Sequence, residues 1–187
     1  NRSSGRMGLA IARAFALRGA KVTLVHGLMD ETTPYYLNQA IFAPTVQLMH
    51  DAVIKAAKVC QIIVKCAAVS DFKPLKASSH KIKKGGSLSL ELVPTPDILA
   101  QLGKLKTRKQ KLVGFAAETE NLIANAREKL LRKNLDLICV NHLDTAGADQ
   151  TMLSVISAAD PKKAKPLQLS GDKYEVALRL VERIVTP

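Results

Sequence analysis

The stretch from Gln61 to Pro74, QIIVKCAAVSDFKP, constrains the fold of this chain more than any other. Its apolar, β-branched run Ile62–Val64 has the length of a strand, and the small residues Cys66–Ala68 then lead into a polar turn. Ligands of an open parallel sheet bind outside the carboxyl ends of its strands. We therefore expect a ligand site between Lys65 and Asp71. Asp71 also has a local interpretation, because aspartate is common in turns and caps for its own hydrogen bonds.

Helix and strand patterns alternate on both sides of this stretch and predict an α/β fold, a Rossmann-like parallel sheet flanked by helices. Strands are expected at Lys21–His26, Ile41–Phe42, Leu112–Ala116, Leu135–Val140, Met152–Ser157 and Pro166–Leu169. Helices are expected from a cap at Ser3 or Ser4 to Gly19, and at Thr45–Ala57, Asp97–Gly103, Asn121–Lys133 and Asp172–Val185. With 187 residues and 47% hydrophobic side chains, residues 1–187 suit one domain with a full core.

The first residues have the pattern of the loop, helix and strand of a βαβ unit. Such a unit places a strand ahead of its loop, since parallel strands are joined by a crossover. We therefore expect the natural polypeptide to extend towards the N-terminal side of Asn1.

A lysine-rich loop at Lys76–Gly86 contains KIKKGG and is followed by SLSLELV at Ser87–Val93. Strict alternation of leucine with polar residues predicts a half-buried antiparallel strand. The segment at about 76–94 is therefore expected to form a small antiparallel arm that acts as a flap or a dimer contact.

The composition favours anionic partners, because 28 Lys and Arg against 16 Asp and Glu give a formal net charge of +12. A polyphosphate ligand and a nucleic acid are both compatible with this positive charge. Aromatic residues make up only 4% and Trp is absent, so a base-stacking platform is poorly supplied. The basic run Lys104–Lys111 is interpreted as a solvated connection, with a nucleic-acid patch as the alternative.

Cys60, Cys66 and Cys139 form no C-x-x-C pair and stand at no zinc-ligand spacing with a histidine, so we expect reduced core residues of a cytoplasmic protein. The sequence contains no apolar run near eighteen residues and no basic-then-apolar leader, and therefore predicts no membrane partner.

The N-terminal SSGRMG and its following helix look like the fingerprint of short-chain dehydrogenases. That family also needs a Tyr-x-x-x-Lys pair. The positions four residues after the three tyrosines hold Gln39, Ala40 and Leu178 instead. An NAD(P)-dependent oxidoreductase therefore remains a minor alternative. The four histidines are scattered, and the sequence indicates no metal ligands.

Six motifs in order, NRSSGRMG, AAVSDFKP, KIKK, PTPDIL, GFAAET and KLLRKNLDLICVN, resemble the phosphopantothenoylcysteine synthetase family over nearly the whole chain. The chain is similar to its bacterial type, usually the C-terminal half of a bifunctional protein of coenzyme A biosynthesis whose other half is a flavin-dependent decarboxylase. The resemblance implies a Rossmann-like homodimer that joins 4'-phosphopantothenate to L-cysteine, using CTP and Mg²⁺ through an acyl-cytidylate. It implies no flavin in this chain, and a first strand and glycine-rich loop ahead of Asn1.

The resemblance also implies roles for individual residues. Asn1 and Lys81 are the implied catalytic residues, Asn1 for turnover of the acyl-cytidylate with cysteine. Nucleotide contacts are implied for Ser3, Ser4, Gly5, Lys65, Cys66, Ala67, Asp71, Lys81, Pro96, Asp97, Ile98, Leu99, Phe115, Lys129 and Lys133.

Physical chemistry agrees with these roles, because activating a carboxylate with a nucleoside triphosphate gathers anionic groups that cations must offset. Lys81 on a glycine-flanked loop is suited to arrive with substrate and exclude water. Asp71 can accept hydrogen bonds from an amino group or a ribose hydroxyl, and Phe115 offers an apolar wall. These arguments do not distinguish CTP from ATP. The alternative from another class is a basic Rossmann-like nucleic-acid-binding module.

Overall fold

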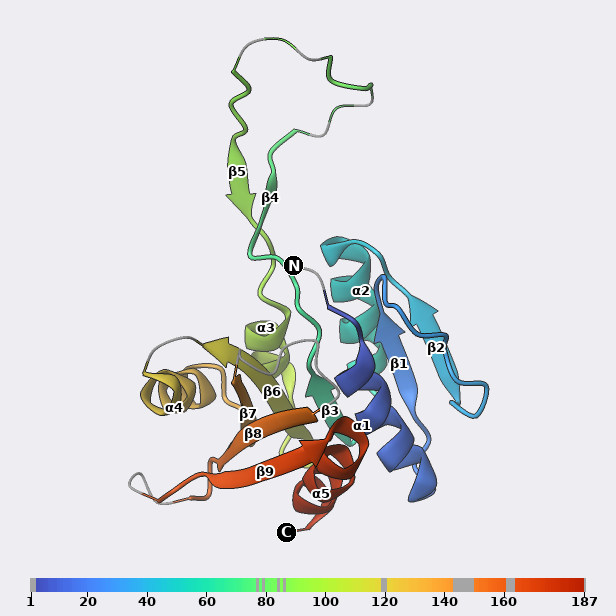
Figure 1. Cartoon of the computed structure of the whole chain (residues 1–187), viewed down its shortest axis with the longest axis vertical. Helices are drawn as coiled ribbons and strands as arrows, with labels where there is room; N and C mark the ends of the chain where they lie inside the picture. The colour runs from blue at the N-terminus through green and yellow to red at the C-terminus, as the bar shows by residue number, and fades with distance from the viewer. Residues whose placement is uncertain are drawn as a thin grey trace.

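The chain folds as three sheets with helices on both sides of the largest, as the computed structural model in Figure 1 shows. The structure describes residues 3–76, 78, 80–83, 85, 87–118, 121–142, 150–160 and 164–186. The largest sheet has the strand order β3-β6-β7-β8-β9. Its strands are β3 (Ile62–Lys65), β6 (Lys111–Glu118), β7 (Leu137–His142), β8 (Gln150–Ser157) and β9 (Leu167–Asp172).

Strands β3, β6 and β7 are parallel, whereas β8 and β9 join the same sheet antiparallel. A separate parallel pair consists of β1 (Thr23–His26) and β2 (Gln39–Phe42). Short antiparallel strands β4 (Phe72–Pro74) and β5 (Leu92–Pro94) form the base of an arm. The predicted α/β class, with a mostly parallel sheet and a small antiparallel arm, is confirmed.

Five helices form among the described residues. They are α1 (Arg6–Leu17), α2 (Val46–Ala57), α3 (Ile98–Leu105), α4 (Leu122–Arg132) and α5 (Lys173–Val185). Side-chain caps explain three of their starts. Thr45 Oγ1 accepts a hydrogen bond from Leu48 N at 3.2 Å, and Asp97 Oδ1 accepts one from Ala100 N at 2.9 Å. Asp172 Oδ1 accepts from the first-turn N–H groups of α5 at 2.8 and 3.0 Å.

The start of α1 differs from the prediction of a serine cap. Gly5 is the N-cap residue with φ +78°, and no side chain caps the helix. The Ser3 and Ser4 hydroxyls lie 3.5 Å from the backbone nitrogens of Gly5 and Arg6, which is long for a hydrogen bond. The left-handed turn at Gly5 sets the entry to the helix instead, because glycine adopts it without steric cost.

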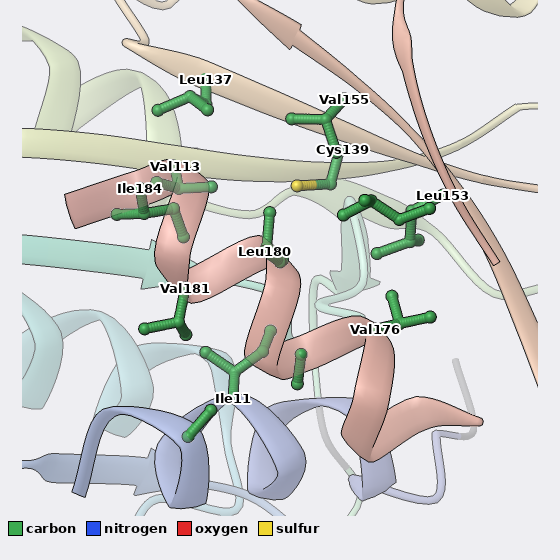
Figure 2. Close-up of a cluster of buried hydrophobic side chains, with 13 residues drawn as sticks. Ile11, Val113, Leu137, Cys139, Leu153, Val155, Val176, Leu180, Val181 and Ile184 are labelled. Atoms are coloured by element: carbon green, nitrogen blue, oxygen red, sulfur yellow. The ribbon is translucent and has the colours of Figure 1, made fainter. Parts of the chain in front are cut away.

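Two core clusters lie on opposite faces of the large sheet because alternate strand residues point to opposite sides. The first core cluster, drawn in Figure 2, joins α1 and α5 to the sheet through residues such as Ile11, Val113 and Leu180. The second core cluster joins α2, α3 and α4 to the other face through residues such as Leu102 and Ile138. Both faces of β6 and β7 are therefore covered, as a parallel sheet requires.

The arm departs from its prediction in length and burial. The sequence predicted a strand over Ser87–Val93. Among the described residues of this segment, only Leu92–Pro94 pairs with another strand. Leu88 and Leu90 are 63% and 57% exposed, so the alternation does not describe a half-buried strand within this chain. Figure 1 shows the reason: the arm extends away from the body, and none of the other described helices or strands lies beside it.

Two parallel strands have an edge that no described residue pairs. Among the described strands, β1 pairs only with β2, and β3 pairs only with β6. Val25 of β1 and Ile63 of β3 both pack into the second core cluster, and every residue of these two strands is only half-buried. The two unpaired edges therefore belong to one layer of the fold, beside α2.

The loop expected at Asp144–Thr151 lies mostly outside the described residues, and Gln150 and Thr151 belong to β8. The other expected helices and strands are confirmed, with ends that differ by a few residues. None of the described helices combines the length and apolar character that a membrane span requires.

Candidate functional site

The candidate site lies at the end of β3, beside Gly114 in the middle of β6, because four separate segments converge there. Lys65 is the last residue of β3 and stands opposite Gly114 of β6, so both face the second core cluster. A Cβ added to Gly114 would lie 2.8 Å from Leu135 Cδ1 and 3.0 Å from Leu99 Cδ2. The missing side chain at Gly114 therefore lets the first turn of α3 approach the end of the sheet.

Two lysines and one aspartate form the charged centre of the site. Lys133 Nζ lies 2.7 Å from Asp97 Oδ2, with the Lys133 side chain 16% exposed and the Asp97 side chain 50% exposed. Asp97 Oδ1 also caps α3. Lys65 Nζ donates to Ala67 O at 2.9 Å and has no carboxylate partner among the described residues. Lys65 and Lys133 therefore place two cations close together, with Asp97 and Asp71 as the carboxylates that act on Lys65, and such a pair of cations suits an anionic ligand.

Protonation follows from these contacts. Burial lowers the pKa of the Lys65 ammonium, the nearby charge of Lys133 lowers it further, and Asp97 and Asp71 oppose this effect. Burial disfavours the charged form of Asp97, but hydrogen bonds from Lys133 and Ala100 N outweigh it and lower the pKa of Asp97. Asp97 is therefore ionised at neutral pH and holds Lys133 as an ion pair.

The backbone around Lys133 is held against α3 by close packing. A Cβ added to Gly103 would lie 1.9 Å from Lys133 O. Asn134 has φ +51° and donates from Nδ2 to Gly103 O at 2.8 Å. These contacts, together with the ion pair to Asp97, fix the end of α4 relative to α3. Nothing in the sequence pattern had indicated them.

The segment after β3 is tied to the segment before α3. Thr95 Oγ1 donates to Ser70 O at 2.5 Å, and Thr95 N donates to Asp71 O at 2.9 Å. Asp71 and the Pro96–Leu99 motif, which the sequence placed in one site, are therefore brought together by main-chain contacts. The Asp71 side chain is exposed and available to a ligand.

The first turn of α1 reaches the same end of β3. A Cβ added to Gly8 would lie 3.2 Å from Cys66 Sγ. The predicted residues Ser3–Gly5 therefore enter the helix close to the end of β3. Burial raises the pKa of the Cys66 thiol, which outweighs the lowering by Lys65, so Cys66 is protonated at neutral pH and is no nucleophile.

Other predicted residues are not joined to this centre. Lys81 is exposed in the arm, which Figure 1 shows extending from the body. Phe115 faces the first core cluster, on the opposite side of the sheet from Lys65. Lys129 is half-buried on α4, one turn before Lys133. Asn1 lies outside the described residues.

The described residues contain no group of three or more His, Cys, Asp or Glu side chains arranged to hold a metal. His50 is instead a link between helices, with Nδ1 2.8 Å from Asp51 Oδ1 and Nε2 2.6 Å from Gln101 Oε1 on α3. The hydrogen bonds to Asp51 and then Gln101 raise the pKa of His50. This arrangement gives His50 a structural role.

The basic run Lys104–Lys111 uses two of its lysines inside the protein. Lys106 Nζ lies 2.7 Å from Asp136 Oδ2. Lys111 Nζ donates to Ile184 O at 2.8 Å and to Thr186 O at 3.0 Å. These bonds favour the interpretation of the run as a connection rather than a nucleic-acid patch.

Known proteins resemble the chain over its whole length. Residues 1–186 match the family described as the DNA/pantothenate metabolism flavoprotein C-terminal domain. The coenzyme A biosynthesis bifunctional protein CoaBC of Haemophilus influenzae is 44% identical over 191 aligned residues, which cover 99% of this chain and 46% of that protein. The protein of the same name from Bacillus subtilis is 37% identical over 189 aligned residues, with 98% and 46% coverage.

A solved structure of the C-terminal domain of coenzyme A biosynthesis bifunctional protein CoaBC superimposes with a TM-score of 0.81 at 33% identity. That comparison covers 98% of this chain and 83% of the solved one. The chain spans about half the length of the curated relatives it matches.

Proposed function

The chain belongs to the family of the DNA/pantothenate metabolism flavoprotein C-terminal domain, and from this premise we propose that it is a phosphopantothenate–cysteine ligase of coenzyme A biosynthesis. The reaction joins 4'-phosphopantothenate to L-cysteine through an acyl-cytidylate, with release of CMP and pyrophosphate. The names of the similar proteins support coenzyme A biosynthesis. The six motifs support the ligase step, the co-substrate CTP and the absence of flavin from this chain.

The observation that carries this proposal is the pair of partly buried lysines, Lys65 and Lys133, beside the end of β3. Lys65 lies beside the ion pair between Lys133 and Asp97 and has no carboxylate partner among the described residues. Attack of a carboxylate on an α-phosphate brings negative groups together, and preorganised cations stabilise that arrangement. Lys65, Lys129 and Lys133 are proposed to hold the phosphates, while Asp71 accepts hydrogen bonds from the substrate amino group or ribose.

Mg²⁺ is proposed to arrive with the nucleotide. Magnesium in such sites is commonly bound by substrate phosphates and one or two carboxylates rather than by a protein cage. The absence of a metal-ligand cluster from the described residues agrees with this mode. Asp71 and Asp97 are the carboxylates near the proposed phosphate position.

Lys81 and the arm are proposed to complete the site. The arm has exposed leucines at positions 88, 90 and 92 and an exposed Ile82. Exposed apolar side chains in a row suit a protein contact, which supports a homodimer in which the arm packs against a second copy. Closure over bound substrate would bring Lys81 to the phosphates and exclude water.

A further parallel strand is proposed to pair with the unpaired edges of β1 and β3. The order β2-β1-strand-β3-β6-β7 would then be that of the doubly wound fold, whose ligands bind where the strand order reverses. The half-buried residues of β1 and β3 would become buried. We propose that this strand lies ahead of Asn1 in the natural polypeptide, with a flavin-dependent decarboxylase fused to it or associated with it.

The proposal is tested by pyrophosphate release from the purified chain with 4'-phosphopantothenate and Mg²⁺, comparing CTP with ATP and adding cysteine last. Release that depends on phosphopantothenate and prefers CTP would support the ligase. Activity only in a chain extended by the additional strand would support the same function and the incomplete sheet. No pyrophosphate release from either chain, together with a gel shift of nucleic acid that is sensitive to salt and insensitive to CTP, would favour a nucleic-acid-binding module.

A further inference from the structure

A cavity of about 430 Å³ lies at the opposite end of the strands from Lys65. Its walls come from the last turns of α2 and α3 and from the segments that lead into β3 and β6. The lining residues are Ile54, Ala57, Lys58, Val59, Cys60, Gln61, Ile63, Leu102, Leu105, Lys106, Thr107, Lys109 and Gln110. We propose that this cavity binds a small amphipathic anion, an apolar body that carries one carboxylate, phosphate or sulfonate group.

The walls of the cavity are apolar. Ile54 and Ala57 of α2 face Leu102 and Leu105 of α3 across it. Leu105 is 57% exposed and Val59 is 86% exposed, so apolar surface continues to the rim. Single exposed apolar side chains are ordinary on protein surfaces, but side chains that gather around a concave site favour an apolar ligand.

The side chain of Gln110 already has hydrogen-bond partners inside the cavity. Gln110 Nε2 donates to Ala57 O at 2.6 Å and to Cys60 O at 2.8 Å. Gln110 Oε1 accepts from Thr107 N at 2.9 Å. The carbonyl oxygens of Ala57 and Cys60 therefore already accept hydrogen bonds and do not need a cationic ligand as a partner. The interior of the cavity is suited to the apolar part of a molecule.

The charge at the rim is positive and unbalanced. Lys106 is neutralised by Asp136, whereas Lys58 and Lys109 have no ion-pair partner among the described residues. No acidic residue lines the cavity. Lys55 and Lys104 lie in the last turns of α2 and α3 and already offset the negative ends of these helix dipoles. Lys58 and Lys109 therefore remain available to an anionic group of a ligand.

The size of the cavity limits the ligand to a small molecule. Ligand pockets commonly enclose about 300–1,000 Å³, and this cavity falls towards the lower end of that range. Its lining shares no residue with the proposed nucleotide contacts. The inference therefore goes beyond the proposed ligase and does not depend on it.

The test uses 8-anilinonaphthalene-1-sulfonate, an aromatic anion that becomes fluorescent in apolar sites, and the uncharged N-phenyl-1-naphthylamine. We expect one site per chain for the anion. The double variant Lys58→Gln with Lys109→Gln should weaken anion binding by about threefold to thirtyfold, the range for losing two exposed charge contacts. Binding of the uncharged probe should not change.

The matched control is Lys21→Gln with Lys73→Gln, which removes the same charge from exposed positions outside the cavity. Equal weakening in both double variants would overturn the inference, because it would show a response to net charge alone. Absence of a saturable site for the anion would overturn it as well.

A second measurement needs no variant. Cys60 lines the cavity, whereas Cys139 is buried in the first core cluster and Cys66 packs against α1. The bound anion should slow alkylation of Cys60 by iodoacetamide, as mass spectrometry of the Cys60 peptide would show. An unchanged rate at saturating anion would place the bound probe elsewhere and refute the site.

Discussion

Replacing Gly103 with alanine tests whether α3 and the end of α4 pack as tightly as the structure shows. Helix propensity alone predicts that alanine inside α3 stabilises the protein by about 1 kcal/mol. The structure predicts the opposite sign. The added Cβ would lie 1.9 Å from Lys133 O and 2.9 Å from Lys133 C, and a backbone contact cannot be relieved by a side-chain rotation.

The size of the effect follows from the required displacement. Normal carbon–oxygen contacts exceed 3 Å, so α3 and the Lys133 backbone must separate by more than about 1 Å. Overpacking of this kind typically costs about 1–3 kcal/mol, and a main-chain clash belongs at the upper end. After subtraction of the propensity gain, we expect a net loss of about 2 kcal/mol and a fall in Tm of about 4–8 °C.

Thermal unfolding by circular dichroism provides the assay, with Gly85→Ala as the control, since no atom lies within 4 Å of a Cβ added there. The displacement also moves Lys133 away from Asp97, so CTP binding measured by calorimetry should weaken. A Gly103→Ala protein with unchanged or higher Tm would refute the close approach of the two helices. Unchanged CTP binding in a destabilised variant would refute the placement of Lys133 in the site.

Four further predictions address other parts of the protein. Lys81→Gln should lower pyrophosphate release about a hundredfold to a thousandfold, the scale for one preorganised donor, and near-normal turnover would remove Lys81 from the mechanism. Because the pKa of His50 is raised in the folded protein, the protonated imidazole stabilises the fold. This contribution to the free energy of unfolding is complete below about pH 6.5 and is lost as pH rises through the raised value. His50→Gln should therefore flatten the stability profile in urea unfolding at pH 5.5 to 8.5, and an unchanged slope would count against the link. Asp97→Asn keeps the helix cap but removes the charge. Because the pKa of Asp97 is lowered in the folded protein, the ionised carboxylate contributes to the free energy of unfolding above about pH 3.8, and this contribution is lost as pH falls through the lowered value. Acid unfolding should show a smaller loss in this variant than in the natural chain, and identical acid transitions would contradict the ion pair. Leu88→Ser with Leu90→Ser should weaken self-association at least about tenfold in sedimentation equilibrium, given the apolar area that both side chains expose, while an unchanged dimer would exclude the arm as its contact.

Local patterns in the sequence predicted the order of the elements except for β4 (Phe72–Pro74), which falls where a polar turn was expected. The caps at Asp97 and Asp172 depend on contacts between residues a few positions apart, and the run Ile62–Val64 can be recognised from its own composition. Such contacts can be recognised without knowledge of the rest of the chain. The glycine cap of α1 is the exception, because Gly5 is constrained by Met29 as well as by its neighbours.

The candidate site was predicted as a set of residues but not as a geometry. The motifs placed Lys65, Asp97 and Lys133 in one site, yet no spacing along the chain indicates that Asp97 pairs with Lys133 and leaves Lys65 without a carboxylate. The arm shows the same limit, since its alternating leucines indicated an apolar face without indicating what covers it. Burial on a strand depends on a neighbour that the local pattern does not contain.

What the sequence determined by itself is the class of fold, the order of its helices and longer strands and the residue types available to an anionic ligand, because periodicity, caps and charge are local properties. Only the tertiary structure decided which lysine is paired, how closely α3 approaches α4 at Gly103, and which strand edges stay unpaired. These features arise where segments distant in the chain pack together. Their energies depend on contacts between those segments, and the local sequence of one segment does not indicate which other segment it contacts.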